Sequence, residues 1–345
     1  MNRMCRTLVA LSTTMLIGLS TYTATAEEPK PEKIVVTAYG GLWAESVKKN
    51  YAPCFEKKTG VRVEVMTGES PDWLNKVKAN PGHSPIDVIA LSELDSLRAA
   101  RDGLLEQMSV EKVPNLAMIP DEFHKPWNDY GVSGNYGAMG VMYNSEAVTA
   151  APASWKQLIE DIAAGKYGKR VSWPSGTYTW GPSQIWWVAQ QYSGDIDVAF
   201  QKMKEISPYV VKFWTTPVEA LNLFATGEVD VLVYWDGRAF SFINKGNDWA
   251  KFSVPEPGGV VSLVMQSVVK GAHPIAWEYI NCVLSVEGQL GNSDTMRYPG
   301  TNKTVSYPEN LAAEFTPLDK IKVPPYHEII DRIPAMIERW NKEMQ

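Results

Sequence analysis

Short apolar runs alternate with amphipathic stretches in the first third of the chain. Three runs rich in β-branched residues are typical of strands, and they cover residues 33–39, 61–66 and 85–92. Between and after them apolar residues recur at helical spacing, which predicts helices over 43–59, 73–79 and 94–102. Pro53 predicts a kink or a break in the first helix. This order of elements predicts an α/β lobe with a parallel sheet.

The chain changes character near residue 125, where glycine and aromatic residues become frequent. Residues 127–144 mix them with strand-like pieces, which indicates a crossover into a second lobe. In that lobe, helices are expected over 155–165, from 183 onward, and over 200–206, 217–227 and 239–245, and strands over 170–173 and 231–235. A strand over 260–269 is expected to return to the first lobe, and helices over 274–285 and 329–342 to follow, with a loop at 296–302 between them.

These patterns give an expected domain organisation. Residues 1–26 form a separate N-terminal segment, which is considered below. The expected parts after it are a flexible leader (27–33), the first part of lobe 1 (34–130), lobe 2 (131–253), the return into lobe 1 (254–310) and a C-terminal helical segment (311–345).

The segment 231–240, VLVYWDGRAF, ends an apolar strand in an aromatic residue, a carboxylate, a glycine and a guanidinium. In α/β folds, ligands bind at the carboxyl ends of the strands. This rule places Trp235, Asp236 and Arg238 at the mouth of a site, together with Tyr234. The alternative is a buried tryptophan followed by a solvated turn.

The first 26 residues have the pattern of a secretory signal peptide. Arg3 and Arg6 precede an apolar run that is too short for a membrane span, and Ala24, Thr25 and Ala26 form a small-residue cleavage site. Cleavage after Ala26 would export the mature chain, and we interpret the arrangement as bacterial and periplasmic. No later stretch is apolar enough to span a membrane, so direct membrane insertion is not expected.

Charge and cysteine content narrow the function classes. The formal net charge of −6 becomes −8 without the two signal-peptide arginines, and such an acidic protein is a poor candidate for binding nucleic acid. Cys54 and Cys282 would form one disulfide or stay as two buried thiols. With four histidines and no Cys/His cluster, no metal site and no cofactor are expected. The remaining length of about 319 residues favours two domains, and 13 tryptophans and 15 tyrosines supply aromatic surface for a pocket.

An ordered series of sequence blocks resembles a known protein family. The blocks are YGG with a helix ending in FEKKTGVRVEV, then DVIALSELDSLRAARDGLLEQM, YGAMGVMYN, SWKQLI, LNLFATGEVDVLVYWDG, VPEPGG, MQSVVKGAHP, WEYINCVLS and RYPGTN. In this order they are similar to the polyamine-type (spermidine/putrescine) periplasmic solute-binding proteins of bacterial ABC importers. The resemblance implies an α/β, two-lobed periplasmic binding protein fold of type II, with the ligand cleft between the lobes. It also implies a monomer that carries a small-molecule solute unaltered to an ABC permease of the inner membrane, and no enzymatic activity.

The resemblance further implies which residues bind the ligand. They lie after the strands, in the return crossover and in the RYPGTN loop: Tyr39, Trp43, Ser92, Glu93, Ser175, Thr177, Tyr178, Trp180, Trp235, Asp236, Arg238, Gln266 and Tyr298. Some have structural alternatives. Glu93 would instead cap a helix, Arg238 would face solvent or pair with an acid across the cleft, and Tyr298 would brace a turn.

Departures from the family pattern bear on the solute. A buried ammonium group needs a paired charge, and polyamine binders have acids where this chain has serine, threonine and glutamine. Glu93 and Asp236 are the only acids at the expected positions. Tryptophan and tyrosine would still hold one cationic head, at about 0.5–2 kcal/mol each, and Arg238 or Arg297 would bind a carboxylate. An amino-acid-like or opine-like solute therefore fits at least as well as a polyamine.

Two other functions are kept as alternatives. A secreted hydrolase would need a Ser–His–Asp set or paired carboxylates, yet no GxSxG motif occurs and none of the four histidines follows a strand end. A ferric-ion-binding protein of the same fold would use a neighbouring tyrosine pair, and the chain has no Tyr-Tyr dipeptide. An absorbance band on adding iron, compared with a melting shift on adding organic solutes, separates these classes.

Overall fold

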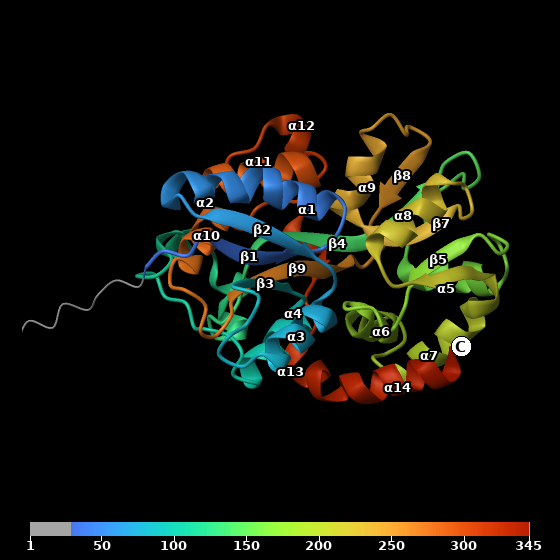
Figure 1. The fold of residues 1–345 in the computed structure, drawn as a ribbon. Coiled ribbons are helices and arrows are strands. Elements are labelled where there is room, and N and C mark those ends of the chain that lie inside the picture. The colour runs from blue at the N-terminus through green and yellow to red at the C-terminus, as the bar shows by residue number, and fades with distance from the viewer. Residues whose placement is uncertain (1–28, 345) are drawn as a thin grey trace, which may run out of the picture. The chain divides into compact units, whose positions relative to one another are not determined.

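A computed structural model describes residues 29–344 of the chain, shown as a ribbon in Figure 1. The predicted signal peptide and its cleavage site lie outside the described residues. Residues 31–344 form one compact unit. Among the described helices, none has both the length and the apolar character needed to cross a membrane.

The strands of this unit belong to one ten-stranded sheet. They are β1 (Lys33–Ala38), β2 (Arg62–Thr67), β3 (Val88–Leu91), β4 (Val132–Asn144), β5 (Val171–Pro174), β6 (Val210–Trp214), β7 (Val231–Trp235), β8 (Ala250–Ser253), β9 (Gly259–Val268) and β10 (Ile321–Lys322). Their order is β2-β1-β3-β9-β4-β7-β5-β6, with β10 beside β9 and β8 beside β4. The strand sets β1–β3 and β5–β7 are each parallel, whereas β4 and β9 pair antiparallel with each other and with their neighbours β7 and β3.

Helices cover both strand sets. They are α1 (Leu42–Ser46), α2 (Ala52–Thr59), α3 (Ser70–Ala79), α4 (Glu93–Arg101), α5 (Trp155–Ala163), α6 (Gly181–Gln190), α7 (Ile196–Ile206), α8 (Pro217–Ala225), α9 (Asp236–Ile243), α10 (Ala276–Val283), α11 (Val286–Met296), α12 (Glu309–Ala312), α13 (Tyr326–Ile329) and α14 (Ile333–Glu343). Figure 1 shows α1 to α4 around β1–β3 and α5 to α8 around β5–β7, with β4 and β9 running between the two sets. The mixed α/β class and the crossover strands agree with the prediction, while the lobe boundaries stay a prediction.

The structure corrects several expected elements. Pro53 does not break its helix, because α1, a π-helical turn (Val47–Tyr51) and α2 follow one another without interruption. The π-helical turn directly before Pro53 is a local departure from α-helical geometry, of the kind that accommodates a proline within a helix. The helix expected from residue 239 begins at Asp236, directly after β7. The tail helix is divided into α13 and α14 by a 3-10 turn over Ile330–Arg332. Some elements were not predicted: β6 is short and only partly buried, α11 has few apolar residues and two glycines, and α12 and β10 are too short to give a periodic pattern.

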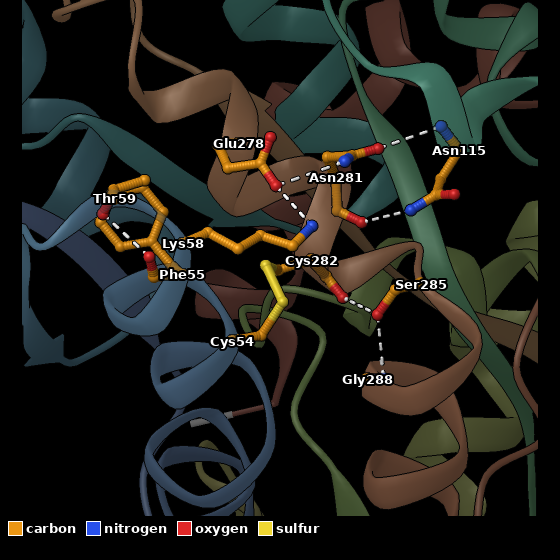
Figure 2. Close-up of a disulfide and its surroundings, with 10 residues drawn as sticks. All are labelled: Cys54, Phe55, Lys58, Thr59, Asn115, Glu278, Asn281, Cys282, Ser285 and Gly288. Carbon is orange, nitrogen blue, oxygen red and sulfur yellow. Dashed lines mark hydrogen bonds and ion pairs between the residues drawn. A yellow bond between two sulfur atoms is a disulfide. The ribbon is translucent and has the colours of Figure 1, made fainter.

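A disulfide joins Cys54 in α2 to Cys282 in α10, as Figure 2 shows. Its Cα atoms lie 5.9 Å apart, and the bond connects positions separated by 228 residues. Lys58 and Glu278, one turn away on the same two helices, form an ion pair at 2.6 Å. Of the two alternatives left open by the sequence, the structure has the disulfide, which is stable in an oxidising compartment such as the periplasm.

Candidate functional site

A cavity lies where the ends of β1 and β7 face β4 and β9. Its lining comprises Tyr39, Trp43, Asn135, Tyr178, Trp180, Pro217, Trp235, Arg238, Ser262, Val264 and Tyr298. Seven of the thirteen residues expected from the sequence are in this set. Four others, Asn135, Pro217, Ser262 and Val264, were not expected.

Aromatic rings form most of the cavity wall and are packed against one another. The ring of Trp180 lies 5.4 Å from that of Tyr39, 5.5 Å from that of Tyr178 and 5.5 Å from that of Trp235, measured between centroids. These separations are in the favourable range for tilted and edge-to-face pairs. Tyr39 follows β1 and Trp180 precedes α6, so this contact joins the two strand sets across the cavity.

Two hydrogen-bond donors in the cavity wall are buried without a partner among the described residues. They are the indole N–H group of Trp43 and the carboxamide nitrogen of Asn135. A buried donor without a partner costs about 1–3 kcal/mol, so an oxygen atom of a bound molecule would offset this cost. Asn135 lies in β4 where the register with β9 shifts between Ser133 and Tyr136. Such irregularities often reorient a side chain at a site, but the glycine-rich sequence there gave no sign of the position.

Arg238 is the charged residue of the cavity wall. It lies in the first turn of α9 and is only 8% exposed. No carboxylate within residues 29–344 forms an ion pair with its guanidinium group. The structure therefore excludes the solvated-face alternative for Arg238 and leaves a buried cation whose donors suit a planar carboxylate.

Glu69 is an acid near this cavity that the list of expected site residues lacked. It lies between β2 and α3, and its Oε2 atom is buried without a hydrogen-bond partner in the described chain. Burial raises the pKa of Glu69 to about 7, while the charge of Arg238 acts in the opposite direction. Glu69 follows a parallel strand, as several expected residues do, so the strand-end rule marks its position although the family resemblance did not select it.

The carboxylate of Asp236 is held by hydrogen bonds from three protein groups. Its Oδ2 atom accepts hydrogen bonds from the Ala138 amide at 3.0 Å and the Thr316 hydroxyl at 2.6 Å, and its Oδ1 atom accepts one from the Gly237 amide at 2.8 Å. Burial nevertheless raises the pKa of Asp236 to about 6. The carboxylate thus joins α9 to β4 and to the C-terminal segment, and its predicted contact with an amine stays a prediction.

Glu93 also lies outside the cavity wall. Its Oε1 atom accepts a hydrogen bond from the Leu263 amide of β9 at 2.6 Å, and burial raises its pKa to about 8. Its alternative role as a helix cap is not seen either, because Ser92 caps α4 by accepting a hydrogen bond from the Asp95 amide at 3.2 Å. Both residues therefore hold α4 in place.

The other expected residues outside the cavity wall have local partners or belong to strands. The hydroxyl groups of Ser175 and Thr177 are bonded to each other at 2.8 Å, and Gln266 pairs with Ala90 of β3 within the sheet. Arg297, the other candidate for binding a carboxylate, forms an ion pair with Glu314 at 3.7 Å.

Two glycines make room for Tyr298 in the cavity wall. A Cβ atom at Gly137 would lie 2.5 Å from the Tyr298 ring, and one at Gly237 would lie 2.6 Å from it. Real Cβ contacts are not this short, so any side chain at either position would displace the ring. Gly137 is in β4 and Gly237 in α9, and the tyrosine thus packs where the crossover strand meets the first turn after β7.

Comparison with known proteins places the chain among solute-binding proteins. A solute-binding protein from Bordetella parapertussis has a crystal structure that matches with a TM-score of 0.76 and 29% sequence identity, over 91% of this chain and 99% of that one. This likeness confirms the predicted two-lobed fold. The spermidine/putrescine-binding periplasmic protein of Escherichia coli (strain K12) is 24% identical over 287 residues, which is 77% of this chain and 78% of that protein.

A second relative has a different solute in its name. The thiamine-binding periplasmic protein of Brucella melitensis is 24% identical over 344 residues, covering 96% of this chain and 97% of that protein. The sequence profile of the family described as bacterial extracellular solute-binding protein matches residues 50–316, most of the chain. The chain belongs to this family, whose members are the extracellular solute-binding components of ABC transporters.

Proposed function

We propose that this protein captures, in the periplasm, a small organic solute with one cationic nitrogen group and one acidic group, and delivers it to an ABC permease. The observation that carries the proposal is the buried and unpaired guanidinium of Arg238 in a wall of tryptophan and tyrosine rings. Amino acids and opines are solutes of this class. The solute would be released unaltered.

The two ends of such a solute match different parts of the site. A cationic head over the faces of Trp180 and Trp235 gains cation–π attraction, about 0.5–2 kcal/mol per ring. The carboxylate of Glu69 adds a counter-charge nearby. An acidic group would form a bidentate pair with Arg238. The unpaired indole N–H of Trp43 would donate to a further oxygen atom.

A bare polyamine fits this charge pattern less well. Its ammonium groups would repel the guanidinium of Arg238, and repulsion between charges is strong where water is largely excluded. The similar proteins named for spermidine/putrescine and for thiamine support the broader class of nitrogenous organic cations. The proposal differs from both in adding an acidic group to the solute.

The same residues are less suitable for binding a ferric ion. Burial raises the pKa values of Tyr39, Tyr178 and Tyr298 well above the usual value for tyrosine, which disfavours phenolate ligands. Arg238 would repel a trivalent cation. Within residues 29–344, no group of three or more His, Cys, Asp or Glu side chains is arranged to hold a metal.

A thermal-shift screen tests the proposed function. Amino acids, opines, quaternary amines and polyamines would be added to the mature protein, and we expect amphoteric compounds to raise its melting temperature most. Trp235→Ala should abolish that shift by removing one wall of the cavity, whereas Trp277→Ala in α10, outside the cavity, should keep it. Binding should also change tryptophan fluorescence. A panel in which only iron or only polyamines stabilise the protein would contradict the proposal.

Affinity for the cationic head should depend on pH through Glu69. Its pKa near 7 is raised by burial, so the carboxyl group is largely protonated at pH 6 and ionised at pH 8. A bound cation favours the ionised form, and affinity should therefore rise up to about tenfold over this interval. Isothermal titration calorimetry at both pH values measures the change. Glu69→Gln should remove most of the rise; an equal rise in that variant would assign it to another group, such as Glu93.

A further inference from the structure

A second pocket lies on the other side of Arg238. Its lining comprises Gly41, Leu42, Glu45, Val218, Leu221, Asn222, Tyr234, Arg238, Ser241, Phe242 and Lys245. Of the residues that line the two pockets, Arg238 is the one they share. The aromatic cavity and this outer pocket therefore meet at the guanidinium group.

The outer pocket is formed by both strand sets. Leu42 and Glu45 come from α1, after β1, whereas Val218 comes from α8 and Lys245 follows α9. The two sides approach closely, since a Cβ atom at Gly41 would lie 3.4 Å from a Val218 methyl group. A molecule that occupied the outer pocket would touch both sides, as would one in the aromatic cavity.

The walls of the outer pocket differ in chemistry from those of the cavity. Leu42, Val218, Leu221 and Phe242 form an aliphatic and aromatic surface in place of the indole wall. Lys245 and Glu45 are both exposed in its lining, and neither forms an ion pair among residues 29–344. With Arg238 and Lys245 the lining has two cations against the one acid, so it suits a short hydrocarbon chain whose anionic end lies beside Lys245.

We infer that the outer pocket is a second subsite, which binds an apolar tail ending in an acidic group. The inference rests on the proposed function, because Arg238 then binds the acidic group next to the amine while the tail passes outward to Lys245. The solute class is thereby narrowed to elongated amphoteric compounds with two acidic groups, such as 2-aminoalkanedioic acids. In this arrangement Arg238 lies where the aromatic cavity meets the outer pocket, and Lys245 lies at the other end of the outer pocket.

The test uses matched probes and two variants. The probes are 2-aminoalkanedioic acids of five to eight carbons, the 2-aminoalkanoic acids of equal length that lack the terminal acid, and alanine as a short member. Val218→Trp fills the outer pocket from a position that is 44% exposed, so folding should tolerate it. Lys245→Gln removes the rim charge. The matched control is Lys251→Gln, because Lys251 is an exposed lysine in β8 outside both pockets.

Isothermal titration calorimetry should give a distinct pattern for each change. Val218→Trp should lower the affinity for the long probes at least tenfold and leave the affinity for alanine unchanged. Lys245→Gln should lower the affinity for the dicarboxylic probes about threefold, as expected for the loss of an exposed ion pair. The affinity for the monocarboxylic probes should not change. Lys251→Gln should behave as the unsubstituted protein does.

The remaining outcomes separate the subsite from the proposed function. If short and long probes bind with affinities that neither variant changes selectively, the subsite is refuted and the proposed function stands. If no probe binds to the unsubstituted protein while polyamines do, both are refuted.

Discussion

Arg238→Met is expected to weaken binding of an amphoteric solute by about 100-fold or more. Removing one partner of a buried, hydrogen-bonded charge pair costs about 2–5 kcal/mol, because the carboxylate of the solute is then left without a counter-charge. Methionine replaces most of the aliphatic stem of arginine, so the cavity wall keeps its shape. Calorimetric titration with the best solute of the thermal-shift screen measures the loss.

The unliganded variant should be no less stable than the unsubstituted protein. Arg238 is a buried cation without an ion-pair partner in the described chain, and its removal relieves a desolvation cost. Arg297→Met is the matched control, since Arg297 pairs with Glu314 outside the cavity wall. Unchanged affinity in Arg238→Met would mean that no acidic group of the solute contacts this guanidinium, and tighter binding of polyamines would identify the solute as a cation alone.

The strand-end rule predicted the aromatic part of the site well. Trp235 ends β7 and Tyr39 follows β1, so each lies at the carboxyl end of a strand in its own parallel set, which is where ligands bind in α/β folds. The α/β class followed from alternating apolar runs and amphipathic helices, which depend on local periodicity alone. The aromatic residues that were predicted from their positions at strand ends therefore lie together in the structure.

The rule was less informative about acids, because it does not say which way a side chain points. Asp236 and Glu93 both follow strands, yet each accepts a backbone amide hydrogen bond from a distant segment, Ala138 for the first and Leu263 for the second. Such partners depend on the tertiary packing of β4 and β9, which no local pattern encodes. Asn135 was missed for the same reason, since a register shift between two strands directs it.

Replacing both disulfide cysteines, in Cys54→Ala/Cys282→Ala, is expected to lower the free energy of unfolding by about 3–5 kcal/mol. The bond restricts the unfolded chain over a separation of 228 residues, and long closed loops give large entropic effects. The melting temperature should fall by roughly 5–10 °C. Differential scanning calorimetry under oxidising conditions measures the change.

Solute affinity should be retained in this double variant at temperatures where it is folded. The disulfide joins α2 to α10, and neither helix contributes a residue to the aromatic cavity or the outer pocket. Adding a reductant should lower the melting temperature of the unsubstituted protein to that of the double variant and leave the double variant unchanged. The opposite result would be two titratable thiols in the unsubstituted protein, denatured without reductant, together with the same melting temperature as the double variant. The cysteines would then be separate buried thiols, and α2 and α10 would be held together by packing alone.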